Sequence, residues 1–127
     1  MSRSLFEKMV PSERTVVISL YTPGDKPVPH DDRWGLHAAF AVPDAQDELP
    51  NCDLPSIFTM IEYARMHDMS IIVQCDAGLS RSVGVAKAIS DCYNLDYRNA
   101  LPGNAVLRSQ LTRFLMRMRG VVNDRVA

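Results

Sequence analysis

Four residues near the middle of the chain have side chains and a spacing suited to chemistry on a phosphate group: Cys75, Gly78, Arg81 and Ser82, in the stretch "QCDAGLSRS". A cysteine thiolate is a good nucleophile, and an arginine presents a planar fork that matches two phosphate oxygens. Glycine permits the backbone conformation and the close approach that a loop wrapped around an anion requires. These residue types predict an anion-binding loop with a nucleophile at its floor.

The segments on either side of this loop indicate how it is positioned. Residues Ile71–Gln74 are apolar and β-branched, which is typical of a central parallel strand covered on both faces. An apolar stripe predicts a helix from about Ser80 to Tyr93. The N-terminus of a helix carries unpaired N–H groups and a partial positive charge, which would stabilise a bound anion and a thiolate at Cys75. Ligands of parallel sheets bind at the carboxyl ends of the strands, where this loop lies.

The first part of the chain predicts two more strands separated by loops. Thr15–Tyr21 and Gly35–Val42 are expected to be strands, and the proline-containing segments Thr22–Asp32 and Pro43–Pro55 are expected to be loops. Trp34 lies between the first loop and the second strand, where it would either line a pocket or cover the sheet.

Two more helices complete the pattern. One is expected after Pro43–Pro55, with Asp53 as its cap and Pro55 in its first turn. The last starts at the cap residue Asn104 and has an apolar stripe made of Leu107, Leu111, Phe114, Leu115 and Met118. Strands alternating with helices predict an α/β fold, with a single three-layer domain over residues 1–127. In that fold a central, mainly parallel sheet is flanked by helices, and the anion loop joins a central strand to a helix.

Composition limits the classes of function. The 127 residues are 46% hydrophobic and 23% charged, with a net charge of −1, so no nucleic-acid partner is expected. No apolar run reaches the ~20 residues of a membrane-spanning helix, so membrane insertion is not expected. The N-terminal residues lack the features of a signal peptide, and we expect a cytoplasmic protein.

The cysteines point to free thiols in a reducing compartment, because Cys52, Cys75 and Cys92 are odd in number and widely spaced. We expect no metal and no cofactor. Zinc is a weak alternative, since the cysteines and histidines show no ligand spacing.

The stretch "QCDAGLSRS" resembles the signature loop of the cysteine-dependent protein tyrosine and dual-specificity phosphatases, in particular small phosphatase-like proteins of bacteria and phages. In that signature a cysteine is followed by five loop residues with glycine third, then an arginine, then Ser or Thr; Cys75, Gly78, Arg81 and Ser82 match those positions. The resemblance implies hydrolysis of a phosphorylated protein or a small phosphomonoester. Phosphotyrosine is the leading substrate, with phosphoserine, phosphoinositides and nucleotides left open.

The resemblance also implies a role for each matched residue. Cys75 would be the nucleophile and carry a phosphocysteine intermediate, and Ser82 would ease departure of the thiolate. Arg81 would bind the phosphoryl oxygens together with the backbone amides of the loop, which belong to Asp76, Ala77, Gly78, Leu79, Ser80 and Arg81.

The chain departs from the family at two places. Gln74 stands where the family has a histidine, so the neighbour of Cys75 brings no titratable charge. The family also places a general-acid aspartate on a separate loop well before the cysteine. Asp44 is the candidate here and Asp47 the alternative, although both are also what an ordinary solvated loop contains.

Three other functions compete with hydrolysis. A catalytically weak or inactive module of the same fold would bind phosphorylated partners. A sulfur or arsenate reductase would need Cys52 or Cys92 as a resolving thiol. A serine hydrolase is a near miss, because "GLSRS" has Ser82 where its motif requires a second glycine. The sequence does not indicate an oligomeric state.

Overall fold

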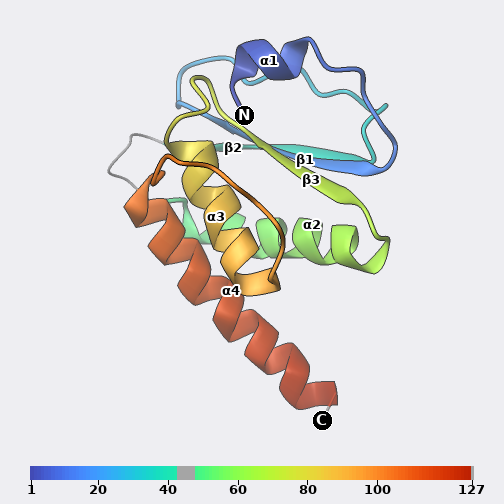
Figure 1. Ribbon diagram of the computed structural model, residues 1–127, viewed down its shortest axis with the longest axis vertical. Helices are drawn as coiled ribbons and strands as arrows, with labels where there is room; N and C mark the ends of the chain where they lie inside the picture. The colour runs from blue at the N-terminus through green and yellow to red at the C-terminus, as the bar shows by residue number, and fades with distance from the viewer. Residues whose placement is uncertain (43–47, 127) are drawn as a thin grey trace.

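The computed structural model describes residues 1–42 and 48–126. Its sheet has three strands, β1 (Thr15–Tyr21), β2 (Leu36–Ala41) and β3 (Ser70–Gln74). All pairings are parallel and the strand order is β2-β1-β3 (Figure 1). The predicted α/β class with a mainly parallel sheet is therefore confirmed, and both early strands lie within one residue of their expected ends.

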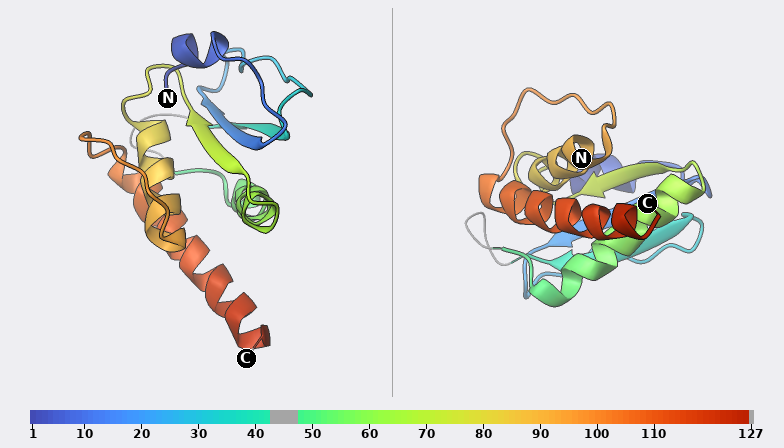
Figure 2. Two further views of the ribbon diagram at one scale, coloured as in Figure 1. Left: turned by 45° about the vertical axis from the view of Figure 1, so that its right-hand side comes forward. Right: turned by 90° about the horizontal axis from the view of Figure 1, so that it is seen from below.

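The helices lie on both sides of this sheet, an arrangement compatible with a three-layer fold. On one side are α2 (Leu54–Met66), α3 (Arg81–Tyr93) and α4 (Ala105–Val126), with the short η1 (Asn51–Asp53) leading into α2. On the other side lie α1 (Arg3–Glu7) and the segment that joins β1 to β2 (Figures 1 and 2). None of the helices described is long and apolar enough to cross a bilayer.

The position of β3 corrects one prediction. The run Ile71–Gln74 was expected to be a central strand, but β3 is an edge strand and β1 is central, since β1 pairs with both β2 and β3. The physical reason is that an apolar, β-branched run indicates that both faces of a strand are buried. It does not indicate whether one or two strands pair with it. Both faces of β3 are covered here, and Val73 is buried.

Strand alternation divides the core into two layers. Val16, Ile18 and Leu20 of β1 point to the helix-covered face, where they join a large apolar cluster. That cluster includes Leu107, Leu111 and Leu115, which are fully buried on α4 as the predicted stripe requires. Burial of these side chains is the main force that holds the helices on the sheet.

The opposite face carries a smaller cluster, which we call the α1-side cluster: Phe6, Val17, Val28 and Trp34, with Ser19 and His37 buried beside it. Trp34 stacks on Phe6 with ring centroids 5.4 Å apart, so it covers the sheet. Ser19 Oγ lies 2.9 Å from His37 Nε2, and the His37 ring stacks on His30. Among the described residues, His37 Nδ1 has no hydrogen-bond partner.

The helix starts agree with the predictions in part. Asn104 Oδ1 accepts a hydrogen bond from Leu107 N at 3.0 Å, as expected of a cap. Asp53 occupies the position before α2, but its side chain makes no capping hydrogen bond, so that expectation was wrong. The residue has a helical backbone there because η1 runs directly into α2. Helix α1 was not predicted; Ser2 Oγ caps it by accepting from Leu5 N at 3.2 Å.

Candidate functional site

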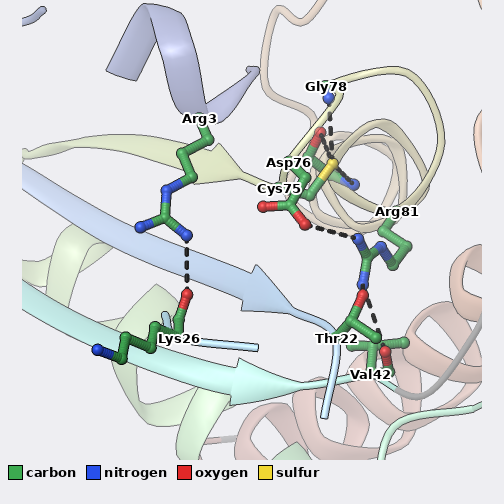
Figure 3. Close-up of polar contacts among 9 residues, drawn as sticks. Arg3, Thr22, Lys26, Val42, Cys75, Asp76, Gly78 and Arg81 are labelled. Atoms are coloured by element: carbon green, nitrogen blue, oxygen red, sulfur yellow. Dashed lines mark hydrogen bonds and ion pairs between the residues drawn. The ribbon is translucent and has the colours of Figure 1, made fainter. Parts of the chain in front are cut away.

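The thiol of Cys75 lies directly after β3 and is only 2% exposed. Three groups contact its Sγ: the Gly78 amide nitrogen at 3.3 Å, the Ser82 amide nitrogen at 3.5 Å and Ser82 Oγ at 3.2 Å. Figure 3 shows Gly78 on the loop above the sulfur. The loop therefore curls so that two backbone donors and one hydroxyl converge on the sulfur.

These contacts change the acidity of the thiol. Burial alone raises the pKa of Cys75 and is the largest single influence. The hydrogen bonds from the Ser82 hydroxyl and from the amides of Ser82 and Gly78, with the charge of Arg81, together outweigh burial. The pKa of Cys75 is lowered as a result, in the direction that the sequence predicted. A larger fraction of this cysteine is therefore thiolate near neutral pH.

Arg81 begins α3, and its side chain is directed across the ends of the other strands. Its Nη1 donates to Thr22 Oγ1 at 3.0 Å and to the Val42 carbonyl oxygen at 3.3 Å (Figure 3). Thr22 follows β1 and Val42 follows β2, so all three strands contribute at their carboxyl ends. The side chain is 15% exposed. No local sequence pattern indicates Thr22 or Val42, because their contact with Arg81 exists only after the strands pair.

The N-terminal residues support the loop from one side, which the sequence also did not reveal. The Cys75 amide donates to the Met1 carbonyl and the Arg3 amide donates to the Asp76 carbonyl, each at 3.0 Å. Ser2 lies opposite Cys75 in a parallel bridge. Gly78 has a φ of +70°, and a Cβ there would lie 2.4 Å from Ser2 N. Gly78 is therefore required both by its backbone conformation and by the closeness of this segment.

The start of α4 supports the loop from the other side. The Ser80 carbonyl accepts from the amides of Gly84 and Asn104, each at 2.9 Å. A Cβ at Gly84 would lie 2.6 Å from the Asn104 carbonyl oxygen, so only glycine fits at this close approach. Cys75 and Arg81 are thus held by contacts from three separate parts of the chain.

The remaining loop residues lie toward solvent. Asp76, Ala77 and Leu79 are exposed, while Ser80 is partly buried before α3. The structure therefore brings Cys75, Gly78, Arg81 and Ser82 together as predicted. Asp44 and Asp47, the two candidates for a general acid, lie outside the described residues.

Gln74 turns away from the helix-covered face and is 1% exposed. Its Oε1 has no hydrogen-bond partner among the described residues. A buried amide oxygen in this state costs free energy, on the order of 1–3 kcal/mol. The residue that directly precedes Cys75 therefore leaves an unsatisfied polar atom on the face of the sheet opposite to the thiol.

The other features noted in the sequence lie away from Cys75. Cys92 is near the far end of α3, about 16 Å along the helix axis from its start, which is beyond the reach of a disulfide. Cys52 is exposed in η1. A cavity of about 470 Å³ follows the free edge of β3 and includes neither Cys75 nor Arg81. Within residues 1–42 and 48–126, no three of His, Cys, Asp and Glu are grouped so as to hold a metal ion.

In chemical terms, the site offers a buried nucleophile of lowered pKa, two loop amides aimed at it and a guanidinium anchored beside it. Such a group of donors suits an anionic electrophile. Comparison of the chain with protein-family models, with curated proteins and with solved structures found no match.

Proposed function

We propose that the protein is a cysteine-dependent phosphatase that hydrolyses phosphomonoesters, with phosphotyrosine as the leading substrate. The observation that supports this proposal is the convergence of the Gly78 amide, the Ser82 amide and the Ser82 hydroxyl on Cys75 Sγ, next to Arg81. Donors placed in this way favour the thiolate, and a thiolate at the floor of an anion site is a nucleophile for phosphoryl transfer.

The proposed reaction has two steps. In the first, Cys75 Sγ attacks phosphorus in line, an S–P bond forms, and the ester P–O bond breaks. The leaving oxygen takes a proton from a general acid, for which Asp44 is the candidate and Asp47 the alternative. In the second step water attacks the phosphorus of the phosphocysteine and gives a proton back to the same carboxylate, the S–P bond breaks, inorganic phosphate is released, and the Ser82 hydroxyl donates a hydrogen bond to the departing thiolate. Arg81 and the loop amides stabilise the phosphoryl oxygens in both steps.

Hydrolysis of a small aryl phosphate, followed together with a panel of phosphopeptides, tests the proposal. We expect turnover by the unaltered protein and none by Cys75→Ser, with inorganic phosphate still bound because the loop donors remain. Turnover retained in Cys75→Ser would reject Cys75 as the nucleophile.

The general acid is tested by comparing esters with good and poor leaving groups. Asp44→Asn should slow the poor leaving group by about 10²–10⁴-fold and the good one much less. Asp47→Asn serves as the matched variant. The general acid is the carboxylate whose loss slows esters with poor leaving groups more than esters with good ones.

One observation favours a second candidate, a module that binds phosphorylated partners without turning them over. Gln74, which directly precedes Cys75 in the chain, is buried and its Oε1 has no partner among the described residues, at a position where the resembling family has a histidine. Phosphopeptide binding without hydrolysis by the unaltered protein would establish this alternative.

A further inference from the structure

The phosphate-binding loop contains a carboxylate, which is an unexpected charge in an anion site. Asp76 directly follows Cys75, and its Oδ2 lies 3.7 Å from Arg81 Nη2 (Figure 3). The other guanidinium nitrogen, Nη1, already donates to Thr22 Oγ1 and the Val42 carbonyl oxygen. Asp76 therefore sits at the Arg81 edge that remains for a phosphoryl group.

The contact between Asp76 and Arg81 is an ion pair that a ligand can displace. At 3.7 Å the two atoms are too far apart for a good hydrogen bond, so charge alone holds the carboxylate there. The Asp76 side chain is 43% exposed, which leaves it room to turn toward solvent. An incoming phosphate dianion must replace the carboxylate at Nη2, and afterwards the two anions are neighbours.

Arg81 is the only ion-pair partner of Asp76 among the described residues, and the Met1 ammonium near the thiol donates instead to the Val73 carbonyl and Ser82 Oγ. Arg3 is also close to this residue, because its backbone amide donates to the Asp76 carbonyl. Its side chain is directed elsewhere: Nε donates to Glu7 Oε1 and Nη1 to the Lys26 carbonyl oxygen, both at 2.7 Å (Figure 3). The loop apex is Leu79, which is 60% exposed and apolar. Asp76 thus places a negative charge next to the thiol. A bound substrate either brings a positive charge to this carboxylate or is repelled by it.

We propose that Asp76 is a specificity-determining residue that selects phosphoprotein segments with a lysine or arginine next to the phosphorylated residue. A substrate cation takes the place of Arg81 as the partner of Asp76 when the phosphoryl group occupies the guanidinium. A second anionic group at the same place meets repulsion, so phosphoinositides and nucleotides are disfavoured. This inference rests on the proposed function and narrows its substrate class.

The test compares three phosphotyrosine peptides that differ only in the following residue, which is Arg, Ala or Glu. Affinities are measured with the Cys75→Ser protein, so that binding is read without turnover. We expect the Arg peptide to bind about fivefold to tenfold more tightly than the Glu peptide, as for a partly exposed charge pair, with the ratio decreasing at high salt. In Cys75→Ser with Asp76→Asn the ratio should fall below about twofold, and a soluble short-chain phosphoinositide should gain affinity.

Asp96→Asn is the matched control, because it removes the same charge at a remote, 84% exposed position whose only ion pair among the described residues is with Arg98. The control should keep the full ratio. Peptide binding with an unchanged ratio in Asp76→Asn, or a parent protein that prefers the phosphoinositide, would overturn the inference and leave the phosphatase proposal intact. Failure of all three peptides to bind, with no hydrolysis by the unaltered protein, would overturn both.

Discussion

The two faces of the sheet differ in the hydrogen bonding of the polar groups buried on them. On the helix-covered face, the one buried thiol, Cys75, accepts from two backbone amides, contacts the Ser82 hydroxyl and lies in a large apolar cluster. On the other face, His37 Nδ1 and Gln74 Oε1 are buried without a hydrogen-bond partner among the described residues. The first arrangement favours the charged form of Cys75, and the second disfavours the charged form of His37. We therefore expect the candidate site to respond to changes in its donors, and the α1-side cluster to respond to protonation.

Loss of the arginine fork should have the largest effect. Arg81→Lys is expected to reduce kcat/KM by about 10²–10⁴-fold, because an ammonium cannot supply two parallel hydrogen bonds to a phosphoryl group. Steady-state kinetics on an aryl phosphate measure this. Arg108→Lys, at an arginine paired with Asp91 on the helix surface, is the matched control. Near-full activity of Arg81→Lys would mean that Arg81 does not bind the substrate.

Gly78→Ala should both destabilise the fold and impair the site. The position has a positive φ, and a Cβ would meet the Ser2 backbone at 2.4 Å. Gly24 also has a positive φ but has no atom within 4 Å of a Cβ, so Gly24→Ala isolates the conformational cost. We expect a loss of about 1–2 kcal/mol for Gly24→Ala and clearly more for Gly78→Ala, measured by urea unfolding. Equal losses of unfolding free energy in the two variants would show that the N-terminal segment moves away from the added Cβ at little cost.

Removal of one donor should raise the pKa of the thiol. Ser82→Ala deletes the hydroxyl at 3.2 Å from Sγ, so the pKa of Cys75 should rise and the acid limb of the rate profile should move to higher pH. The ultraviolet absorbance of the thiolate and the rate of alkylation measure the shift. Ser82→Thr, which keeps a hydroxyl, should restore the lower pKa. An unchanged alkylation profile in Ser82→Ala would exclude the hydroxyl as a donor to the thiolate.

Acid should weaken the α1-side cluster. Burial, and then the charge of His30, lower the pKa of His37 below 6.5, against an opposing effect of Asp31. The unfolded chain therefore binds the proton more tightly, so this stability is complete above 6.5 and is lost as the pH falls below that value. The expected loss is about 1 kcal/mol for each unit of pKa difference. In His37→Gln the urea midpoint of unfolding should change less with pH below 6.5 than it does in the unaltered protein. The same pH dependence in both proteins would show that another group causes the loss of stability.

A second acid-sensitive group acts in a different window. The pKa of Asp31 is lowered from 3.8 to about 2 by its hydrogen bonds and charge interaction with Arg33. Its contribution is therefore lost only as the pH falls below 3.8, which separates it from the effect of His37.

The smallest effect is expected from replacing Gln74 with the histidine of the phosphatase signature that the loop resembles. Gln74→His should lower the pKa of Cys75 by a fraction of a unit to about one unit, because a protonated imidazole near the thiolate stabilises it. The acid limb of the rate profile would then extend to lower pH. A shift to higher pH would show that the buried position keeps the imidazole neutral.

The sequence predicted the parts of the fold and of the candidate site that depend on residues close together in the chain. The loop from Cys75 to Ser82 is contiguous, and its strand and helix follow directly on either side, so motif and periodicity sufficed. The contacts of Arg81 with Thr22 and Val42 and those of Cys75 with Met1 join distant segments, and no local pattern encodes them. The place of β3 at the sheet edge was hidden for the same reason, because strand order depends on pairing between segments far apart in the chain.

The all-parallel sheet has a consequence for the order in which the molecule forms. Among the described residues no hairpin joins two strands, so each pairing must close a long loop before it gains any contact. Such non-local topologies fold slowly compared with helical proteins of the same size. The contacts that hold the Cys75 loop span still more of the chain, since the partners Met1 and Ser82 are 81 positions apart. We therefore expect thiol reactivity of the native kind to appear late in refolding, after the sheet has formed.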